Sequence, residues 1–319
     1  MRVRFWGTRG SLPVSLTAED IKTKIVEALL AAAGRNLRSR ADVEAFVERD
    51  LPFSVSHTYG GNSSCVELDL GTEEHVLCDL GTGVRSFGLN VLARKGPHTP
   101  CTFHVFMSHL HWDHIMGFPY FPHVYIPGNR IVIYGCHAGM EEAFRRQHAA
   151  PYFPVDFSRL AAQVEFVKLE PGRRVLHAGL DVTPKRQLHS GDSYGYRFER
   201  DGKIVVYSTD SEHKLEDPRE TRGFVEFFRN ADLVIFDAMY SLADTVSVKE
   251  DWGHSSNVVG VELCQLARAK HLCIYHHEPV HNDLNIASVL QETLRLEEIT
   301  RSDHPLRVSS AYDGLEIAV

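Results

Sequence analysis

MSHLHWDHIMGF, residues 107–118, places three histidines and an aspartate within six positions. An apolar run with the character of a buried strand comes immediately before the first histidine. Side chains two residues apart on a strand face the same side, so His109 and His111 can bind one metal ion. We expect a helix to begin near Asp113, where Asp113 and His114 can reach a second ion. Imidazole and carboxylate groups at this spacing are typical metal ligands, and the stretch therefore predicts a metal site.

Strands and helices alternate along most of the chain. We expect strands at 2–6, 65–71, 75–81, 102–107, 131–135, 163–168, 180–188, 194–199, 203–208, 232–236, 271–275 and 315–318, and helices at 222–230, 255–269 and 283–298. This alternation predicts layered α/β packing in a single domain that spans residues 1–319. Residues 17–50 instead show apolar residues at helical spacing, which predicts a helical insertion. Such an insertion could form a lid, a subunit contact or a satellite helical hairpin.

The composition is that of a folded globular protein. Charged residues make up 24% of the 319 residues and hydrophobic residues 43%. The formal net charge of −8 argues against binding to extended nucleic acid or to an anionic membrane, which requires many basic side chains. No apolar run approaches the roughly 18 residues of a membrane span, and no signal peptide is evident, so we expect a cytoplasmic protein. The six cysteines form no CxxC pair and are expected to be reduced core residues.

The histidine array resembles the signature of the metallo-β-lactamase superfamily. The five motifs of that family are matched in order by Asp79 in LCDLGTG, by His109-Leu-His111-Trp-Asp113-His114, by His189 in QLHSGDSYGY, by Asp210 in IVVYSTD and by His276 in LCIYHHEP. The resemblance extends over nearly the whole chain. It implies an αββα sandwich with the site at one edge of the two sheets.

The resemblance also implies a role for each motif residue. One ion would lie among His109, His111 and His189, a second among Asp113, His114 and His276, and Asp210 would bridge the two. Asp79 would orient the site without binding metal. His277 is the rival of His276, but the register of LCIYH places His276 directly after the strand. Mixed imidazole and carboxylate ligands suit Zn²⁺ best, with Mn²⁺ or Fe as alternatives.

Two neighbouring divalent ions imply hydrolysis by a bridging hydroxide. Asp210 counts against β-lactams, because the β-lactam hydrolases of the family commonly have a thiol there. DWGHSSN, residues 251–257, resembles the GHS(T) element of ribonuclease Z and related phosphodiesterases, although Ser256 stands where many relatives have threonine. The resemblance implies that His254 protonates the leaving oxygen, and Asp113 and His254 are thus the expected catalytic residues. Alternatively, a serine of this stretch is simply a helix N-cap.

The motif spacing favours a small substrate. Ribonuclease Z usually carries a long arm for tRNA between the third and fourth motifs, but only 21 positions separate His189 from Asp210 (210 − 189). WGTRGSLP, YGGNSS and HEPVHND also resemble phosphodiesterases that act on cyclic nucleotides or cyclic phosphates. We therefore predict a phosphodiesterase for a small nucleotide-type or cyclic phosphodiester.

Other residues near the motifs have two interpretations each. Arg9, Asn62 and Ser255 could contact the substrate, or they could serve turns and helix ends. His281 and Asp283 could support the metal site, or they could belong to a helix cap with Asn282.

Three other functions remain open. They are a thioester hydrolase of the glyoxalase II type, a tRNA 3′-processing ribonuclease Z, and a metal-bound ligand sensor without turnover. The sequence also leaves both a monomer and a homodimer open.

Overall fold

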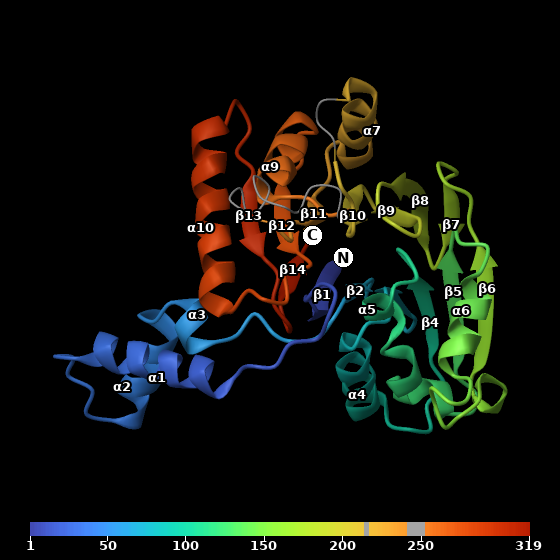
Figure 1. Cartoon of the computed structure of the whole chain (residues 1–319), viewed down its shortest axis with the longest axis horizontal. Coiled ribbons are helices and arrows are strands. Elements are labelled where there is room, and N and C mark those ends of the chain that lie inside the picture. Colours follow the sequence, from blue (N-terminus) through green and yellow to red (C-terminus); the bar gives the residue numbers. More distant parts are fainter. Residues whose placement is uncertain (214–216, 241–252) are drawn as a thin grey trace.

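The computed structural model describes residues 1–213, 217–240 and 253–319. Within these ranges, two seven-stranded sheets form the body of the molecule (Figure 1). The first sheet has the strand order β14 (Glu316–Ala318), β1 (Arg2–Gly7), β2 (Cys65–Asp69), β3 (His75–Cys78), β4 (Thr102–Phe106), β5 (Arg130–Gly135) and β6 (Gln163–Lys168). The second has the order β13 (Arg307–Ser310), β12 (His271–Tyr275), β11 (Leu233–Asp237), β10 (Lys203–Ser208), β9 (Ser193–Arg200), β8 (Leu180–Gln187) and β7 (Val175–His177).

The two sheets pack face to face, and helices cover their outer faces. Phe106 of β4 contacts the rings of Tyr196 and Phe198 of β9 at centroid distances of 5.6 and 5.1 Å. The first sheet is covered by α4 (Gly83–Lys95), α5 (Trp112–Ile115), α6 (Met140–Gln147) and the 3₁₀ turns η1 (Phe118–Tyr120), η2 (Pro122–Tyr125) and η3 (Phe157–Arg159). The second is covered by α7 (Pro218–Phe228), α9 (Asn257–Leu266) and α10 (Asp283–Thr300). This is the αββα layer order expected from the sequence.

Strand direction places the motif residues at one edge of the two sheets. Strands β3 to β6 run parallel, as do β10 to β13, and β8 points the same way as β10 because both are antiparallel to β9. In α/β proteins, binding residues gather beyond the carboxyl ends of parallel strands. The motif residues follow β3, β4, β8, β10 and β12, so strands from both sheets deliver them to the same edge.

The predicted helical insertion contains α1 (Ala18–Ala32) and α2 (Arg40–Arg49), and the short helix α3 (Phe53–Ser56) follows it. We call residues 17–50 the arm, because they project from the body at the lower left of Figure 1. Capping boxes start both helices: Thr17 pairs with Asp20, and Ser39 pairs with Asp42. These local bonds define the helices even though α1 contains no buried residue.

Some boundaries and elements differ from the sequence-based expectation. Helix α7 begins at Pro218 rather than at 222, because Asp217 caps it and proline is well tolerated in the first turn. Helices α4 and α6 and strands β7 and β13 were not predicted; α4 contains two glycines and lacks a clear apolar period, and α6 is only eight residues long with four charged side chains. All six cysteines are buried and unpaired, as expected. No helix in the described ranges combines the length and the hydropathy of a bilayer span.

Candidate metal centre

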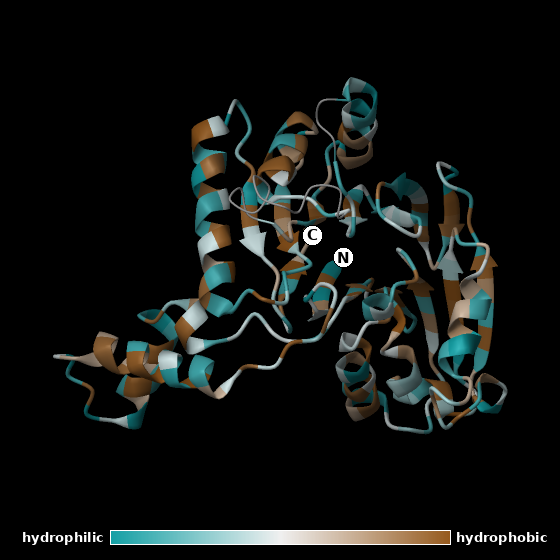
Figure 2. Ribbon diagram, viewed as in Figure 1, coloured by the Kyte–Doolittle hydropathy of each residue, from teal (hydrophilic) through white to brown (hydrophobic). Residues whose placement is uncertain are grey.

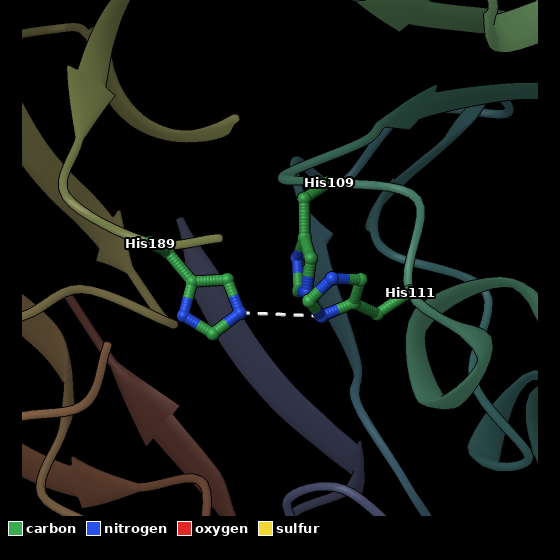
Figure 3. Close-up of side chains that lie close together, drawn as sticks. All are labelled: His109, His111 and His189. Atoms are coloured by element: carbon green, nitrogen blue, oxygen red, sulfur yellow. Dashed lines mark hydrogen bonds between the residues drawn. The ribbon is translucent and has the colours of Figure 1, made fainter. Parts of the chain in front are cut away.

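Three of the predicted histidines form one ligand group (Figure 3). His109 and His111 come from the turn after β4, and His189 comes from the turn after β8. His111 Nδ1 and His189 Nε2 face each other at 3.2 Å, and the His109 ring lies 4.5 Å from that of His111. Three imidazole nitrogens within 4.8 Å of one another can share one metal ion.

A second group lies directly beside the first. It consists of Asp113, His114, Asp210 and His276, which are all buried. His114 Nε2 is 3.1 Å from Asp113 Oδ2 and 3.4 Å from His276 Nε2. This group also gathers its ligand-type atoms within 4.8 Å, so it offers a second cation site.

Asp210 lies between the two groups and shows a different oxygen to each. Its Oδ1 is 3.2 Å from Nε2 of both His114 and His276. Its Oδ2 is 3.6 Å from His109 Nε2 and 3.8 Å from His189 Nε2. One carboxylate therefore has the position of a bridge between two neighbouring cations.

Asp79 orients the second group from behind. Its Oδ2 accepts hydrogen bonds of 2.7 Å each from His114 Nδ1, Ser108 Oγ and the Tyr207 hydroxyl, and its Oδ1 accepts one from Ser108 N. Because His114 donates through Nδ1, its Nε2 is left as the atom that faces the cluster. A carboxylate in this position fixes the tautomer and the direction of a ligand imidazole.

Backbone groups orient other members of the cluster. His189 Nδ1 donates to the carbonyl of Gly253 at 2.8 Å, which turns its Nε2 toward Asp210. Ser11 N donates to Asp113 Oδ2 at 2.9 Å and so holds that carboxylate. A Cβ atom at Gly10 would lie 2.5 Å from His276 Nδ1, so only glycine fits where the N-terminal loop passes the cluster.

Three of the motif residues adopt left-handed backbone conformations. Asp79, Asp210 and His276 have φ angles of 60°, 49° and 61°. Each follows a buried strand, and this conformation turns the side chain out of the sheet toward the edge. A non-glycine residue in this region costs about 1–3 kcal/mol, which the surrounding structure must offset.

The electrostatics of the cluster favour ionised carboxylates. Burial tends to raise the pKa of Asp210, but His276, His114 and His109 outweigh it and hold that pKa well below its ordinary value. The pKa of Asp113 is likewise lowered by His114, against the effect of burial. The pKa of His109 is lowered well below normal, chiefly by burial, so this imidazole is neutral. Burial tends to lower the pKa of His114, but Asp113, Asp210 and Asp79 outweigh it and raise that pKa well above its ordinary value. Because neutral imidazoles and charged carboxylates are the forms that bind divalent cations, a cation bound at His114 would displace a proton.

His254 lies beside the cluster and is paired with a carboxylate that the sequence analysis missed. Its ring stacks on that of His276 at 5.2 Å, and its Nδ1 donates to Asp237 Oδ2 at 2.8 Å. Burial tends to lower the pKa of His254, but Asp237 outweighs it and raises the pKa to about 9. Asp237 ends strand β11, so its position after a buried apolar strand, as for Asp79 and Asp210, was the signal available in the sequence.

The donor set fits bound cations. His109 Nε2 is buried without a hydrogen-bond partner, although its Nδ1 lies 3.1 Å from Ser108 Oγ. A buried polar atom without a partner is costly, and here it points at the Asp210 carboxylate from 3.6 Å. Imidazole nitrogens and carboxylate oxygens are ligands that Zn²⁺ accepts readily.

His276, rather than His277, belongs to the cluster. His277 Nε2 donates to the carbonyl of Ala311 at 2.8 Å, away from the other ligands. Burial lowers the pKa of His277 to about 3, so it stays neutral. The Asp251 and Trp252 positions of the DWGHSSN stretch lie outside the described residues.

Two residues predicted as substrate contacts are engaged with the protein instead. The buried Arg9 guanidinium donates to the carbonyls of Gly60, Glu278 and His281, and thereby joins three loops. Asn62 Nδ2 donates to Asp313, and its Oδ1 accepts from Thr82. These contacts fit the structural alternative, and a substrate role for Arg9 or Asn62 remains a prediction.

The two serines just before α9 also contact the protein. Ser255 Oγ donates to the carbonyl of Ser211 at 2.6 Å rather than facing an open site. Ser256 is the N-cap of α9, because its side chain accepts from Val259 N. The cap interpretation therefore describes Ser256, while His254 remains beside the metal cluster.

Asp283 was expected to support the metal site, and in the structure its carboxylate contacts the arm and the backbone of Tyr59. Its carboxylate lies 2.6 Å from Lys24 Nζ of the arm and accepts a hydrogen bond from Tyr59 N. Asn282 caps α10 with a full capping box, as the alternative proposed. His281 contributes its backbone carbonyl to Arg9 and is not a member of either ligand group.

Two solved structures share the arrangement of the whole chain. The metallo-beta-lactamase fold protein YhfI from Bacillus subtilis superposes with a TM-score of 0.64 over 99% of this chain and 98% of its own, at 16% identity. The short form of human tRNase Z superposes with a TM-score of 0.60 over 100% and 99%, at 20% identity. At these identities the likeness establishes the fold alone.

Sequence comparison adds a relative and a family. Ribonuclease Z from Thermoplasma acidophilum is 34% identical over 98 residues, which are 31% of this chain and only 28% of that protein. The family model of the beta-lactamase superfamily domain matches residues 74–277, which hold every predicted metal ligand. Because that match covers well over half of the 319 residues, the chain belongs to the beta-lactamase superfamily.

Proposed function

We propose that this protein is a dinuclear metal-dependent phosphodiesterase for a small nucleotide-type or cyclic phosphodiester. The observation that carries the proposal is the Asp237–His254 pair, which lies beside the two ligand groups that have Asp210 between them. Imidazole and carboxylate ligands favour Zn²⁺ as the cation, with Mn²⁺ or Fe as alternatives. The aspartate at 210, in place of a thiol, counts against β-lactams as substrates.

Two divalent cations held here would offset negative charge on the phosphate oxygens and activate water for attack on phosphorus. The protein's own contribution is to fix the geometry. Asp210 holds the two ligand groups at a set separation, and Asp79 and the Gly253 carbonyl aim the imidazoles of His114 and His189. Ser11 N, in the N-terminal loop, donates a hydrogen bond to Asp113 and so fixes that carboxylate in the site.

His254 supplies the proton for the leaving oxygen. Because its Nδ1 donates to Asp237, Nε2 is the atom that can transfer a proton. The Asp237 carboxylate stabilises the charged imidazolium, as expected for a general acid. The His254 ring also lies 5.1 Å from that of His189, so it adjoins both ligand groups.

Ribonuclease Z activity is the second candidate, since a relative carries that name. Like the proposed reaction, it cleaves a phosphodiester bond. The interval from His189 to Asp210 is filled by β9 and β10, which leaves no room for a long tRNA-binding arm. The net charge of −8 also favours a small substrate over tRNA.

Substitution of the general acid tests the proposal with two substrates. A nucleotide p-nitrophenyl ester releases a stable anion that needs little protonation, whereas a nucleoside 2′,3′-cyclic phosphate releases an alkoxide that needs a proton. His254→Ala should lower kcat for the cyclic phosphate by about 10²–10⁴-fold and for the p-nitrophenyl ester by much less. Metal content, measured by elemental analysis, should stay at the wild-type level.

Several results would contradict this proposal. An equal loss of kcat on both substrates would show that His254 is not the general acid. Loss of metal in His254→Ala would show that His254 is a metal ligand. Failure of the metal-loaded wild-type protein on both esters, with hydrolysis of lactoylglutathione, would favour a thioesterase. Cleavage of precursor tRNA without turnover of small diesters would favour ribonuclease Z. Tight binding of a nucleotide that is never consumed would favour a sensor.

A further inference from the structure

A cavity of about 670 Å³ lies beside the turn that carries the metal ligands. Its walls come from α5, η1, α6 and the segment that follows α6. Leu110 and Trp112 line it, and these two residues alternate along the chain with the ligands His109 and His111. A molecule bound in the cavity would therefore touch the same turn that presents the imidazoles to the cations.

Aromatic rings form much of the wall. Tyr120 and Phe153 pack edge to face with ring centroids 5.6 Å apart. Trp112 and Tyr152 are each 79% exposed, although both are large aromatic side chains. Exposed aromatic rings gathered around a concave site are typical of a ligand-binding surface.

One polar group in this cavity has no partner in the part of the chain that the structure describes. Gln147 lines the cavity near the end of α6, and its Nε2 is buried without a hydrogen-bond partner among the described residues. The neighbouring Arg146 is already paired with Glu142 at 2.5 Å. An amide donor buried in this way requires an acceptor, and a ligand in the cavity can supply it.

We infer that this cavity binds the base of a nucleotide substrate whose phosphate lies at the metal cluster. The base stacks on Trp112 and accepts a hydrogen bond from Gln147 Nε2. A nucleobase combines a flat ring, which suits aromatic walls, with carbonyl or ring-nitrogen acceptors, which suit an amide donor. This inference rests on the proposed function and assigns the feature by which the site selects its substrate.

The test compares two esters with the same leaving group. Thymidine 5′-monophosphate p-nitrophenyl ester carries a base, and methyl p-nitrophenyl phosphate carries none. Trp112→Ala should raise KM for the thymidine ester about tenfold, the change expected from losing one base–aromatic stack, and leave its kcat unchanged. Kinetics on the methyl ester should not change. Ile299→Ala, which also removes an exposed apolar side chain but on α10, is the control and should affect neither ester.

Two further variants test the cavity at residues outside the turn that carries the metal ligands. Gln147→Met keeps the length of the side chain and removes the amide, and it should raise KM for the thymidine ester several-fold. Tyr152→Ala should act in the same direction. Both residues lie far in sequence from His109 and His111, so their metal content should equal that of the wild type. Unchanged KM values in all three variants, or equal losses on both esters with metal retained, would overturn the inference.

Binding can also be measured without turnover. Trp112 is one of three tryptophans in the chain, with Trp6 and Trp252. Uridine 5′-monophosphate should quench tryptophan fluorescence of the wild type, and Trp112→Phe should abolish the quench while it keeps KM for the thymidine ester within about threefold. Quenching without hydrolysis of either ester would support the base site and reject the phosphodiesterase. Hydrolysis of both esters with equal kcat/KM and no quenching would do the reverse.

Discussion

The metal cluster and the arm are held in place by opposite means. The two ligand groups join side chains from four separate segments, and His109, His114 and His276 are fully buried within them. Its positions depend on long-range hydrogen bonds such as the one from His114 to Asp79. The arm is a single continuous stretch with its own capping boxes, and α1 buries no residue. A site built from distant segments exists only in the folded protein, whereas the arm helices are defined locally.

The arm also turns its polar side toward the body. Lys24 reaches Asp283 and the carbonyls of Ser54 and His57, whereas Ile25 and Leu29 are 55% and 67% exposed. Figure 2 shows the hydrophobic residues of α1 on this projecting part of the molecule. Helical spacing of apolar residues therefore predicted the helix correctly but not the face that contacts the protein. The roles of the arm as a lid or as a subunit contact remain predictions.

Loss of the bridging carboxylate should have the largest effect on the cluster. Asp210→Ala removes the group that faces both ligand sets, and it leaves buried imidazoles without their anionic partner. We expect turnover of the p-nitrophenyl esters to fall by more than about a hundredfold. This exceeds the usual loss on removing a residue that only hydrogen-bonds to a metal ligand. Elemental analysis should show reduced metal content.

Asp303→Ala is the control for Asp210→Ala. The Asp303 side chain is 70% exposed, and its contacts with Arg268, His304 and Ser302 all lie at the surface. Its removal should change neither metal content nor turnover. Full metal occupancy in Asp210→Ala would contradict the assignment of Asp210 as a bridge.

Asp79→Asn should have an intermediate effect, because Asp79 acts through His114 rather than on the substrate. Its Oδ2 accepts three hydrogen bonds, and an amide nitrogen in that position would meet donors instead of satisfying them. We expect metal affinity, measured by competition with a chelator, to fall about 10–100-fold. Asp181→Asn, on the solvent-exposed side of β8, should leave metal affinity unchanged. Wild-type affinity in Asp79→Asn would show that burial alone orients His114.

The smallest effect on the active site is expected from loosening the arm. Lys24→Ala removes the ion pair with Asp283 and two hydrogen bonds to carbonyls, and it should weaken docking of the arm by about 2 kcal/mol. Limited proteolysis within residues 17–50 should become faster. Turnover and metal content should stay within about twofold of the wild type, because no ligand comes from the arm.

Lys22→Ala is the matched control on the same helix. Lys22 is 70% exposed and, among the residues that the structure describes, pairs with Glu19 alone, so its removal should leave proteolysis unchanged. A large loss of turnover in Lys24→Ala would instead show that the arm is coupled to the site. The connection would run through Asp283 and the loop that follows His276.

Much of the fold and of the candidate site could be predicted from the sequence. Apolar patterning located most strands, their alternation with helices predicted layered α/β packing, and the resemblance to the family implied the αββα layer order. The ligand-type residues stand at strand ends, where a change from apolar to polar character is visible in the sequence. The resemblance to the metallo-β-lactamase signature singled out His109, His189, Asp210 and His276 among them, and the structure brings these four together.

Tertiary structure alone decided the contacts that depend on distant partners. Asp237 at the end of β11 meets His254, which lies 17 positions later and just before α9, and nothing local in LVIFD marks that contact. Arg9 and Asp283 are charged residues near the motifs, but the folded loops surround them with carbonyls or with Lys24, and so give them structural roles. The sequence specifies which side chains occur at each strand end and in what order. Packing determines which of them meet, because a contact between distant segments depends on the path of every element between them.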